Sequence, residues 1–284
     1  MKKKAALAAC SNGLPETRRK QAEELEKFLK EIGMEVVLSR CLYERGGTAF
    51  SGSPRERAEE LMRFYRDPEM DLIFDLSGGD AANGILPYLD FEAIGNSRAV
   101  FWGYSDLTTI INAIYAKTGR SSVLYQARNL TYAPGEWQRQ AFQNWREGKK
   151  TDLFDFSWEF IQGASMEGTV VGGNMRCLLK LAGTEYWPDM QGKILLLEAA
   201  GGLAPQMASC LAQLGQIGVF GQVRGILLGT FLSMEESGSR PGIEELAKEY
   251  AGEKIPIART AQIGHRTDSH GILIGSSLVL GSRL

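Results

Sequence analysis

The sequence predicts an α/β protein with two domains: an N-terminal parallel-sheet (flavodoxin-like) domain and a second, smaller C-terminal α/β domain. Between residues 5 and 125, short apolar runs alternate with segments whose apolar residues recur at helical spacing. Residues 126–165 mix aromatic and polar side chains without a clear period, which indicates a partly helical connection. A second alternating set begins at residue 166. Because such alternation favours a parallel sheet covered by helices, we expect domains at 1–125 and 166–284 joined by 126–165.

The elements of the first domain follow from these runs and from the residues that bound them. Residues 5–9 form a short apolar strand, and the helix after it ends at Gly33, a residue type that commonly terminates helices. The next helix opens with Ser53 and Pro54, and proline is well tolerated in a first turn. In order, strands are expected at 5–9, 35–38, 72–76 and 99–102, and helices at 16–32, 53–65, 81–89 and 106–115.

The second domain repeats the pattern with three apolar runs, each followed by a segment of helical period. A further apolar run lies near the C-terminus. Strands are expected at 168–172, 193–197 and 225–228, helices at 174–181, 205–214 and 243–249, and the last apolar run is 272–280.

Composition argues against several classes of function. The formal net charge is −2, whereas a nucleic-acid binder needs a surplus of Lys and Arg, so no nucleic-acid polymer is expected as a partner. No apolar run approaches the roughly 20 residues that span a bilayer, so no membrane partner is expected. The four cysteines match no zinc or redox spacing, and the two histidines exclude a site built from several imidazoles. We therefore expect neither a metal nor a cofactor.

The N-terminus resembles a lipoprotein signal, with lysines, an apolar stretch and then Cys10. The apolar stretch at 5–9 is shorter than the about 7–15 residues that a signal requires. We therefore expect a buried first strand and a cytoplasmic protein with reduced cysteines.

The segment 101–108 (FWGYSDLT) is a candidate nucleophile site. An apolar strand ends at Gly103, Ser105 lies on the turn, and a helix follows at once, which is the order of a nucleophile elbow. The helix N-terminus and the Asp106 amide would favour a developing oxyanion. Ser105 also fits a simple helix N-cap, and Leu107 stands where the elbow motif usually has glycine.

Three other segments carry candidate chemistry. The strand at 72–76 leads to Ser77-Gly78-Gly79-Asp80, whose amides suit an anion or an oxyanion, or form an ordinary turn. Glu198 ends a buried strand, where it would orient an imidazole or simply start a surface loop. The two candidate imidazoles are His265, preceded by a glycine, and His270.

Together these segments resemble the LD-carboxypeptidase family of serine peptidases, which includes muramoyltetrapeptide carboxypeptidases and microcin C self-immunity proteins. The resemblance covers nearly the whole chain. Residues 103–108 match the family motif GxSDxT, and 83–90 (NGILPYLD) are similar to its LLPYLD segment. Similar segments are 9–13 (ACSNG), 77–80 (SGGD), 172–174 (GGN), 181–184 (LAGT), 186–189 (YWPD) and 192–195 (GKIL).

The resemblance implies a triad of Ser105, Glu198 and His265, since the spacing from Gly264-His265 to Ile274-Gly275 selects His265 over His270. It also implies an oxyanion hole formed by the amides of Gly79 and Asp106. The implied reaction removes a terminal D-residue from a murein peptide without a cofactor, and the implied assembly is a homodimer.

The sequence departs from the family at several positions, and these bear on the substrate. Ser77 and Asp80 replace an Arg and a Tyr around the glycine pair, and Leu273 replaces a Pro. Asp80 would repel a substrate carboxylate or pair with a cation. Trp187 is either a core residue or a wall of the substrate site.

The alternatives to a murein carboxypeptidase are three. One is a hydrolase of a microcin-like peptide–nucleotide conjugate, and another is a catalytically silent ligand-binding protein. The third, a phosphate-binding kinase or transferase, lacks the lysine-containing loop that it would need.

Overall fold

The four apolar runs predicted in the first domain form strands that pair in parallel, and a fifth short strand joins them. In the computed structural model, which describes residues 3–132 and 135–281, these strands follow the order β2-β1-β3-β4-β5. This is the flavodoxin-like order, as predicted, and ligand sites in such sheets lie at the carboxyl ends of the strands where the strand order reverses, which here is between β1 and β3. The bounds are β1 Lys4–Ala8, β2 Glu35–Leu38, β3 Met70–Asp75, β4 Val100–Gly103 and β5 Ser122–Leu124.

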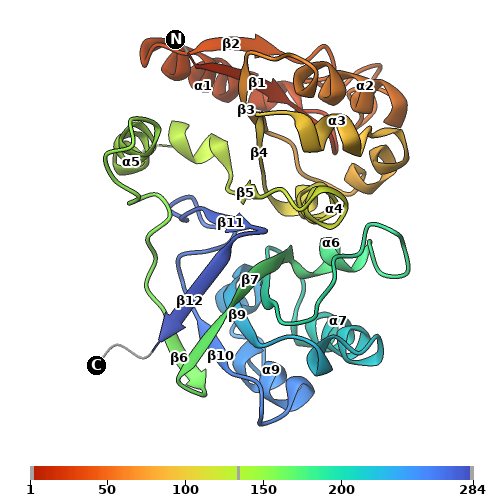
Figure 1. Cartoon of the computed structure of the whole chain (residues 1–284), viewed down its shortest axis with the longest axis vertical. Helices are drawn as coiled ribbons and strands as arrows, with labels where there is room; N and C mark the ends of the chain where they lie inside the picture. The colour runs from red at the N-terminus through yellow and green to blue at the C-terminus, as the bar shows by residue number, and fades with distance from the viewer. Residues whose placement is uncertain (1–2, 133–134, 282–284) are drawn as a thin grey trace.

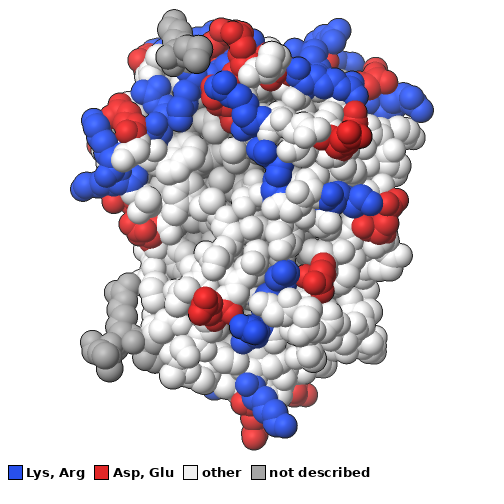
Figure 2. All heavy atoms as spheres, in the orientation of Figure 1, with Lys and Arg blue, Asp and Glu red and all other residues white. Residues whose placement is uncertain are grey.

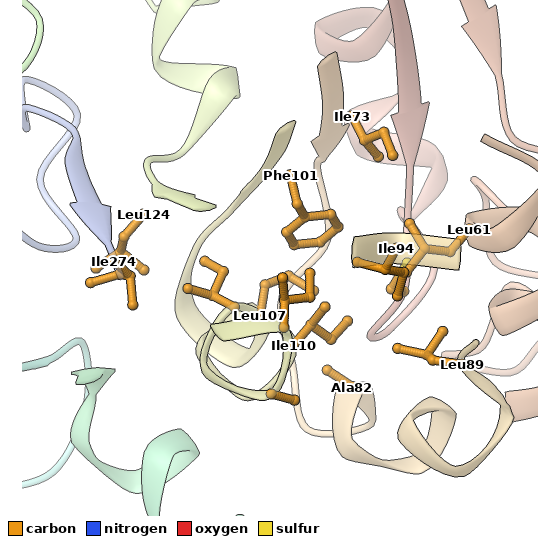
Figure 3. Packing of buried hydrophobic residues seen from close by; sticks show 14 of the residues in the cluster. Leu61, Ile73, Ala82, Leu89, Ile94, Phe101, Leu107, Ile110, Leu124 and Ile274 are labelled. Carbon is orange, nitrogen blue, oxygen red and sulfur yellow. The ribbon is translucent and has the colours of Figure 1, made fainter. Parts of the chain in front are cut away.

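Both faces of this sheet are covered because side chains alternate along each strand. Leu7, Phe74 and Trp102 pack on one face. Ile73 and Phe101 pack in the core on the other face, which Figure 3 shows. The helices are η1 Glu16–Arg18, α1 Arg19–Glu31, α2 Pro54–Tyr65, η2 Ala82–Tyr88, α3 Phe91–Asn96, η3 Ser105–Leu107 and α4 Thr108–Thr118.

Two expected α-helices differ in detail. The segment expected as a helix at 81–89 is the 3₁₀ helix η2, which contains Pro87 and therefore lacks one backbone donor. The helix expected at 106–115 begins with the 3₁₀ turn η3 and continues as α4, which ends at Gly119.

The described residues of the segment 126–165, which are 126–132 and 135–165, pack mainly on the first sheet. The segment contains η4 (Ala127–Thr131), α5 (Glu136–Arg146) and, at its end, β6 (Glu159–Gln162). Phe142 of α5 lies against Phe74 and Trp102, with ring centroids 5.9 and 5.8 Å apart. Most of this connection therefore contributes to the first core, and only β6 enters the second sheet.

The second sheet has the order β12-β7-β8-β9-β10-β6 and lies below the first in Figure 1. Its four central strands are parallel, and the two outer strands run antiparallel to their neighbours. The bounds are β7 Ser165–Asn174, β8 Ile194–Ala199, β9 Gly225–Phe231, β10 Ile257–Arg259 and β12 Ser277–Gly281. The helices are α6 Met175–Leu179, α7 Ala204–Gln216, η5 Val219–Gly221, α8 Leu232–Ser237 and α9 Ile243–Ala251.

Two features hold the sheets together. The C-terminal segment returns to the first sheet, where β11 (Ile272–Ile274) pairs antiparallel with β5, and Figure 3 shows Ile274 beside Leu124. On α4, Asn112 exchanges two hydrogen bonds with the backbone of Gly172 in β7, at 2.9 and 2.8 Å. The helix that follows Ser105 is therefore fixed against the second sheet.

The charged side chains mix on the surface. On the face shown in Figure 2, Lys and Arg stand beside Asp and Glu, most of them over the first domain, and a broad central area carries few charges. In the described parts of the chain, no helix is both long and apolar enough to cross a membrane.

Candidate active site

Ser105 has an unusual backbone conformation at the end of β4. The φ angle of Ser105 is +57°. Among the described residues, Ser105 is the only residue other than glycine with a positive φ. L-residues seldom adopt this region, and such strain gathers at functional turns. A Cβ at Gly103 would lie 2.7 Å from the side chain of Leu107, so the tight turn requires glycine there. The Ser105 hydroxyl caps no helix, since the N-cap positions of η3 and α4 are Tyr104 and Leu107.

The Ser105 hydroxyl lies at one end of a chain of hydrogen bonds. Its Oγ is 3.1 Å from Nε2 of His265, and Nδ1 of the same imidazole is 2.5 Å from Oε2 of Glu198. Glu198 ends β8 and is 1% exposed, whereas His265 lies in the loop after β10. The three side chains therefore come from both sheets, in an order that can move a proton from a hydroxyl to an imidazole held by a carboxylate.

His270 lies elsewhere. Its Nδ1 is 3.2 Å from the carbonyl oxygen of Asp152, and its ring stacks on Trp137 at 4.7 Å. Burial lowers the pKa of His270. The structure thus brings His265, and not His270, to Ser105.

The loop after β3 lies beside the nucleophile. A Cβ on Gly78 would lie 4.0 Å from Ser105 Oγ, which places this backbone next to the hydroxyl. Gly79 has φ of +121°, and a Cβ there would overlap the carboxamide of Asn12. Asn12 holds the loop through two hydrogen bonds, from its own amide to the Gly78 carbonyl at 3.2 Å and from the Asp80 amide to its side chain at 3.3 Å.

A fully buried carboxylate anchors the base of this loop. Asp75 accepts hydrogen bonds from the Ser77 amide at 2.9 Å, the Ser77 hydroxyl at 2.5 Å and the Cys10 amide at 2.7 Å. Burial raises the pKa of Asp75, and these hydrogen bonds oppose that effect. The turns after β1 and β3 are thereby tied together at the carboxyl ends of these neighbouring strands.

Asp80 and Asp106 belong to a charged cluster that the sequence did not reveal. Asp80 pairs with Arg176, whose hydrogen bond lowers the pKa of the carboxyl despite an opposing effect of burial. Lys180 lies 3.4 Å from Oδ1 of Asp80 and 2.5 Å from Oδ1 of Asp106. Of the two roles expected for Asp80, repelling a carboxylate or pairing with a cation, the structure shows the second. The cations are the side chains of Arg176 and Lys180.

The two aromatic side chains Trp187 and Tyr104 have different surroundings. Trp187 packs, partly buried, against the cores of both domains, and no described contact joins it to the triad. Tyr104 instead lies over His265, with ring centroids 4.2 Å apart, and burial raises its pKa. In the sequence, the only indication that Tyr104 belongs to the site was its position directly before Ser105.

A small cavity of about 10 Å³ lies behind Glu198. Two buried polar atoms of its lining residues, Oε1 of Glu198 and Nε2 of Gln126, have no hydrogen-bond partner in the described structure. A space of this size and polarity suits a single water. The described residues contain no cluster of three or more His, Cys, Asp or Glu side chains that could hold a metal ion.

Comparison with known proteins gives a consistent result over the whole chain. Residues 5–125 match the LD-carboxypeptidase N-terminal domain, and residues 167–280 match the LD-carboxypeptidase C-terminal domain. The chain is 30% identical to a probable murein peptide carboxypeptidase of Bacillus subtilis, over 90% of this chain and 82% of that protein. It is 29% identical to the microcin self-immunity protein MccF of Escherichia coli, over 91% and 83%.

Solved structures share the fold. An MccF-like protein from Bacillus anthracis is 26% identical and superposes with a TM-score of 0.85, over 99% of this chain and 94% of that one. A muramoyltetrapeptide carboxypeptidase from Oxalobacter formigenes, 23% identical, superposes with a TM-score of 0.81 over 99% and 95%.

Proposed function

The chain belongs to the LD-carboxypeptidase family of serine peptidases, and we propose that it removes the terminal D-residue from a murein peptide by means of Ser105, His265 and Glu198. Membership of this family makes the protein a serine-type amide hydrolase. The observation that carries the assignment of residues is the hydrogen-bonded chain from Ser105 Oγ through His265 to Glu198, at 3.1 and 2.5 Å.

The proposed reaction has two halves. Ser105 Oγ attacks the carbonyl carbon of the scissile amide, and its proton passes to Nε2 of His265. The tetrahedral intermediate collapses as His265 gives that proton to the leaving amine of the D-residue, which leaves an acyl ester on Ser105. A water then attacks the ester with His265 as base, and the shortened peptide departs as a carboxylate while Ser105 regains its proton.

Glu198 and the two backbone amides have supporting roles. Because Glu198 is buried and bonds to Nδ1, it fixes the imidazole with Nε2 toward Ser105 and stabilises the cation that forms. We propose that the amides of Gly79 and Asp106 donate to the oxyanion, and each such donor is worth roughly 3–4 kcal/mol. The closeness of Gly78 to Ser105 supports the role proposed for the neighbouring Gly79 amide.

The choice of a murein peptide rests on the relatives and on Asp80. The Bacillus subtilis relative is named a murein peptide carboxypeptidase. A peptide that loses its terminal residue presents a carboxylate near the scissile bond, and a free Asp80 would repel it. Arg176 and Lys180 neutralise Asp80, so its carboxylate does not exclude a substrate with a terminal carboxylate.

A second candidate is hydrolysis of a microcin-like peptide–nucleotide conjugate. It is favoured by the 29% identity to the self-immunity protein MccF and by the segments 11–15 (SNGLP) and 78–83 (GGDAAN), which are nearer to that branch of the family.

One experiment separates these candidates. Purified protein is incubated with a murein tetrapeptide ending in D-Ala, with the same peptide ending in L-Ala, and with a processed aspartyl–nucleotide conjugate, and products are followed by mass spectrometry. We expect release of D-Ala alone, and no release by Ser105→Ala. Cleavage of only the conjugate would make the second candidate correct. Absence of all turnover, together with no labelling of Ser105 by a fluorophosphonate, would leave a silent binding protein.

We also propose that the protein lies in the cytoplasm and works as a homodimer; the second of these proposals rests on the family resemblance. Light scattering at micromolar concentration tests the assembly, and a monomeric mass would refute it.

A further inference from the structure

Lys180, in the second domain, contacts both segments of the first domain that supply the proposed oxyanion donors, the turn with Asp106 and the loop with Gly79 and Asp80. It follows α6, and its Nζ lies 2.5 Å from Oδ1 of Asp106 and 3.0 Å from the carbonyl oxygen of Asp80. Asp106 follows Ser105, and Asp80 follows Gly79. One ammonium group therefore bonds to Asp106, whose amide is one proposed oxyanion donor, and to Asp80, the residue that follows the other donor, Gly79.

The Asp106 carboxylate needs this cation. It is fully buried, and its other oxygen accepts hydrogen bonds from Ser11 Oγ at 2.6 Å and from the Ala82 amide at 2.8 Å. Lys180 is its ion-pair partner in the described structure, and its side chain is 18% exposed. A buried carboxylate without a counter-charge is strongly unfavourable, so loss of the ammonium would destabilise the present conformation of the turn after Ser105.

The two domains do not need Lys180 to stay together. The paired hydrogen bonds between Asn112 and Gly172, and the pairing of β11 with β5, hold them independently. The contacts of Lys180 instead concentrate on the residues beside Ser105 and Gly79. Oxyanion donors must be placed to within about 0.5 Å to be effective, so a small shift of this turn is sufficient to slow the reaction.

We propose that Lys180 is a positioning residue, which sets the amides of Asp106 and Gly79 against the scissile carbonyl through its bonds to Asp106 and Asp80. This inference rests on the proposed function. It adds a residue outside the triad, supplied by the second domain, that controls the transition state without touching the substrate.

The test compares Lys180→Met with Lys117→Met. Lys117 also joins the two domains through an ion pair, 2.7 Å from Glu185, but this pair is away from the charged cluster. We expect Lys180→Met to lower kcat about 10–100-fold with KM within about threefold, because only the transition state uses the oxyanion donors. Labelling of Ser105 by a fluorophosphonate should slow by a similar factor. Lys117→Met should change neither rate more than about twofold.

Two further variants separate positioning from folding. Lys180→Arg keeps the cation and should recover most of kcat. Lys180→Met combined with Asp106→Asn removes both buried charges, and its loss of kcat should be smaller than the product of the two single losses, since both act through one interaction. Wild-type kcat in folded Lys180→Met, or multiplicative losses in the double variant, would overturn the proposal.

The rate of labelling of Ser105 by the fluorophosphonate distinguishes failure of the Lys180 proposal from failure of the proposed function. If the tetrapeptide is not hydrolysed but Ser105 of the wild type is labelled, the substrate assignment fails and the labelling ratio still decides on Lys180. If Ser105 is not labelled at all, the serine mechanism and the role of Lys180 fall together.

Discussion

Replacing Gly79 by alanine tests the oxyanion loop most directly. The added Cβ would overlap the carboxamide of Asn12, and φ of +121° lies in a region that L-residues rarely adopt. The backbone strain costs about 1–3 kcal/mol. Displacing Asn12 also breaks its hydrogen bond to the Asp80 amide, worth about 0.5–1.5 kcal/mol. We therefore expect the free energy of unfolding to fall by about 1.5–4.5 kcal/mol.

The expected effect on catalysis is larger than on folding. If the Gly79 amide donates to the oxyanion, its displacement should lower kcat about 10²–10³-fold, as loss of one donor does in other serine hydrolases. The assay measures kcat and KM for release of D-Ala from the tetrapeptide, at a temperature where urea titration shows the variant to be folded. KM should change little, because the ground-state carbonyl uses the donor weakly.

A matched control is Gly119→Ala. Gly119 also has positive φ, +71°, but it ends α4 and a Cβ there meets nothing within 4 Å. This variant should lose about 1 kcal/mol of stability from backbone strain alone and keep its kcat. Asn12→Ala measures the lost hydrogen bond without strain. If folded Gly79→Ala keeps kcat within about threefold of the wild type, the proposed donor role of Gly79 is wrong.

Three further predictions concern the triad, the second histidine and a remote carboxylate. Glu198→Gln should lower kcat about 10³–10⁴-fold, because the buried partner of His265 would no longer be an anion; a kinetic assay beside a urea titration checks this, and a loss below tenfold would count against the triad. His270→Gln should keep kcat within about threefold, since His270 bonds to a backbone carbonyl away from Ser105; an inactive but folded variant would reverse the assignment of the base. Burial raises the pKa of Glu60, but hydrogen bonds, that from Arg63 first, outweigh it and lower the pKa from 4.5 to about 2. The resulting stabilisation, of the order of 3 kcal/mol at most, is complete above pH 4.5 and disappears as the pH falls toward 2. The melting temperature of Glu60→Gln should therefore depend less on pH in this range than that of the wild type. An equal slope of melting temperature against pH in both proteins would refute this prediction.

The sequence by itself determined the parallel-sheet architecture of the first domain and the approximate place of its strands. These follow from local patterns, since apolar runs and helical periods depend on residues a few positions apart. The motif around Ser105 and the glycine pair after β3 were visible for the same reason. The resemblance to a known family then selected His265 over His270, which spacing within the chain alone left open.

Only the tertiary structure decided how distant segments meet. The return of β11 to the first sheet leaves no local mark, because pairing of Ile272–Ile274 with β5 joins residues about 150 positions apart. The charged cluster was equally hidden. Lys180 lies 74 positions from Asp106, and nothing in the residues around either one indicates that they meet. Such contacts are set by the packing of α4 against the second sheet, and a lysine just after a short helix has the same local pattern whether it faces solvent or a buried carboxylate.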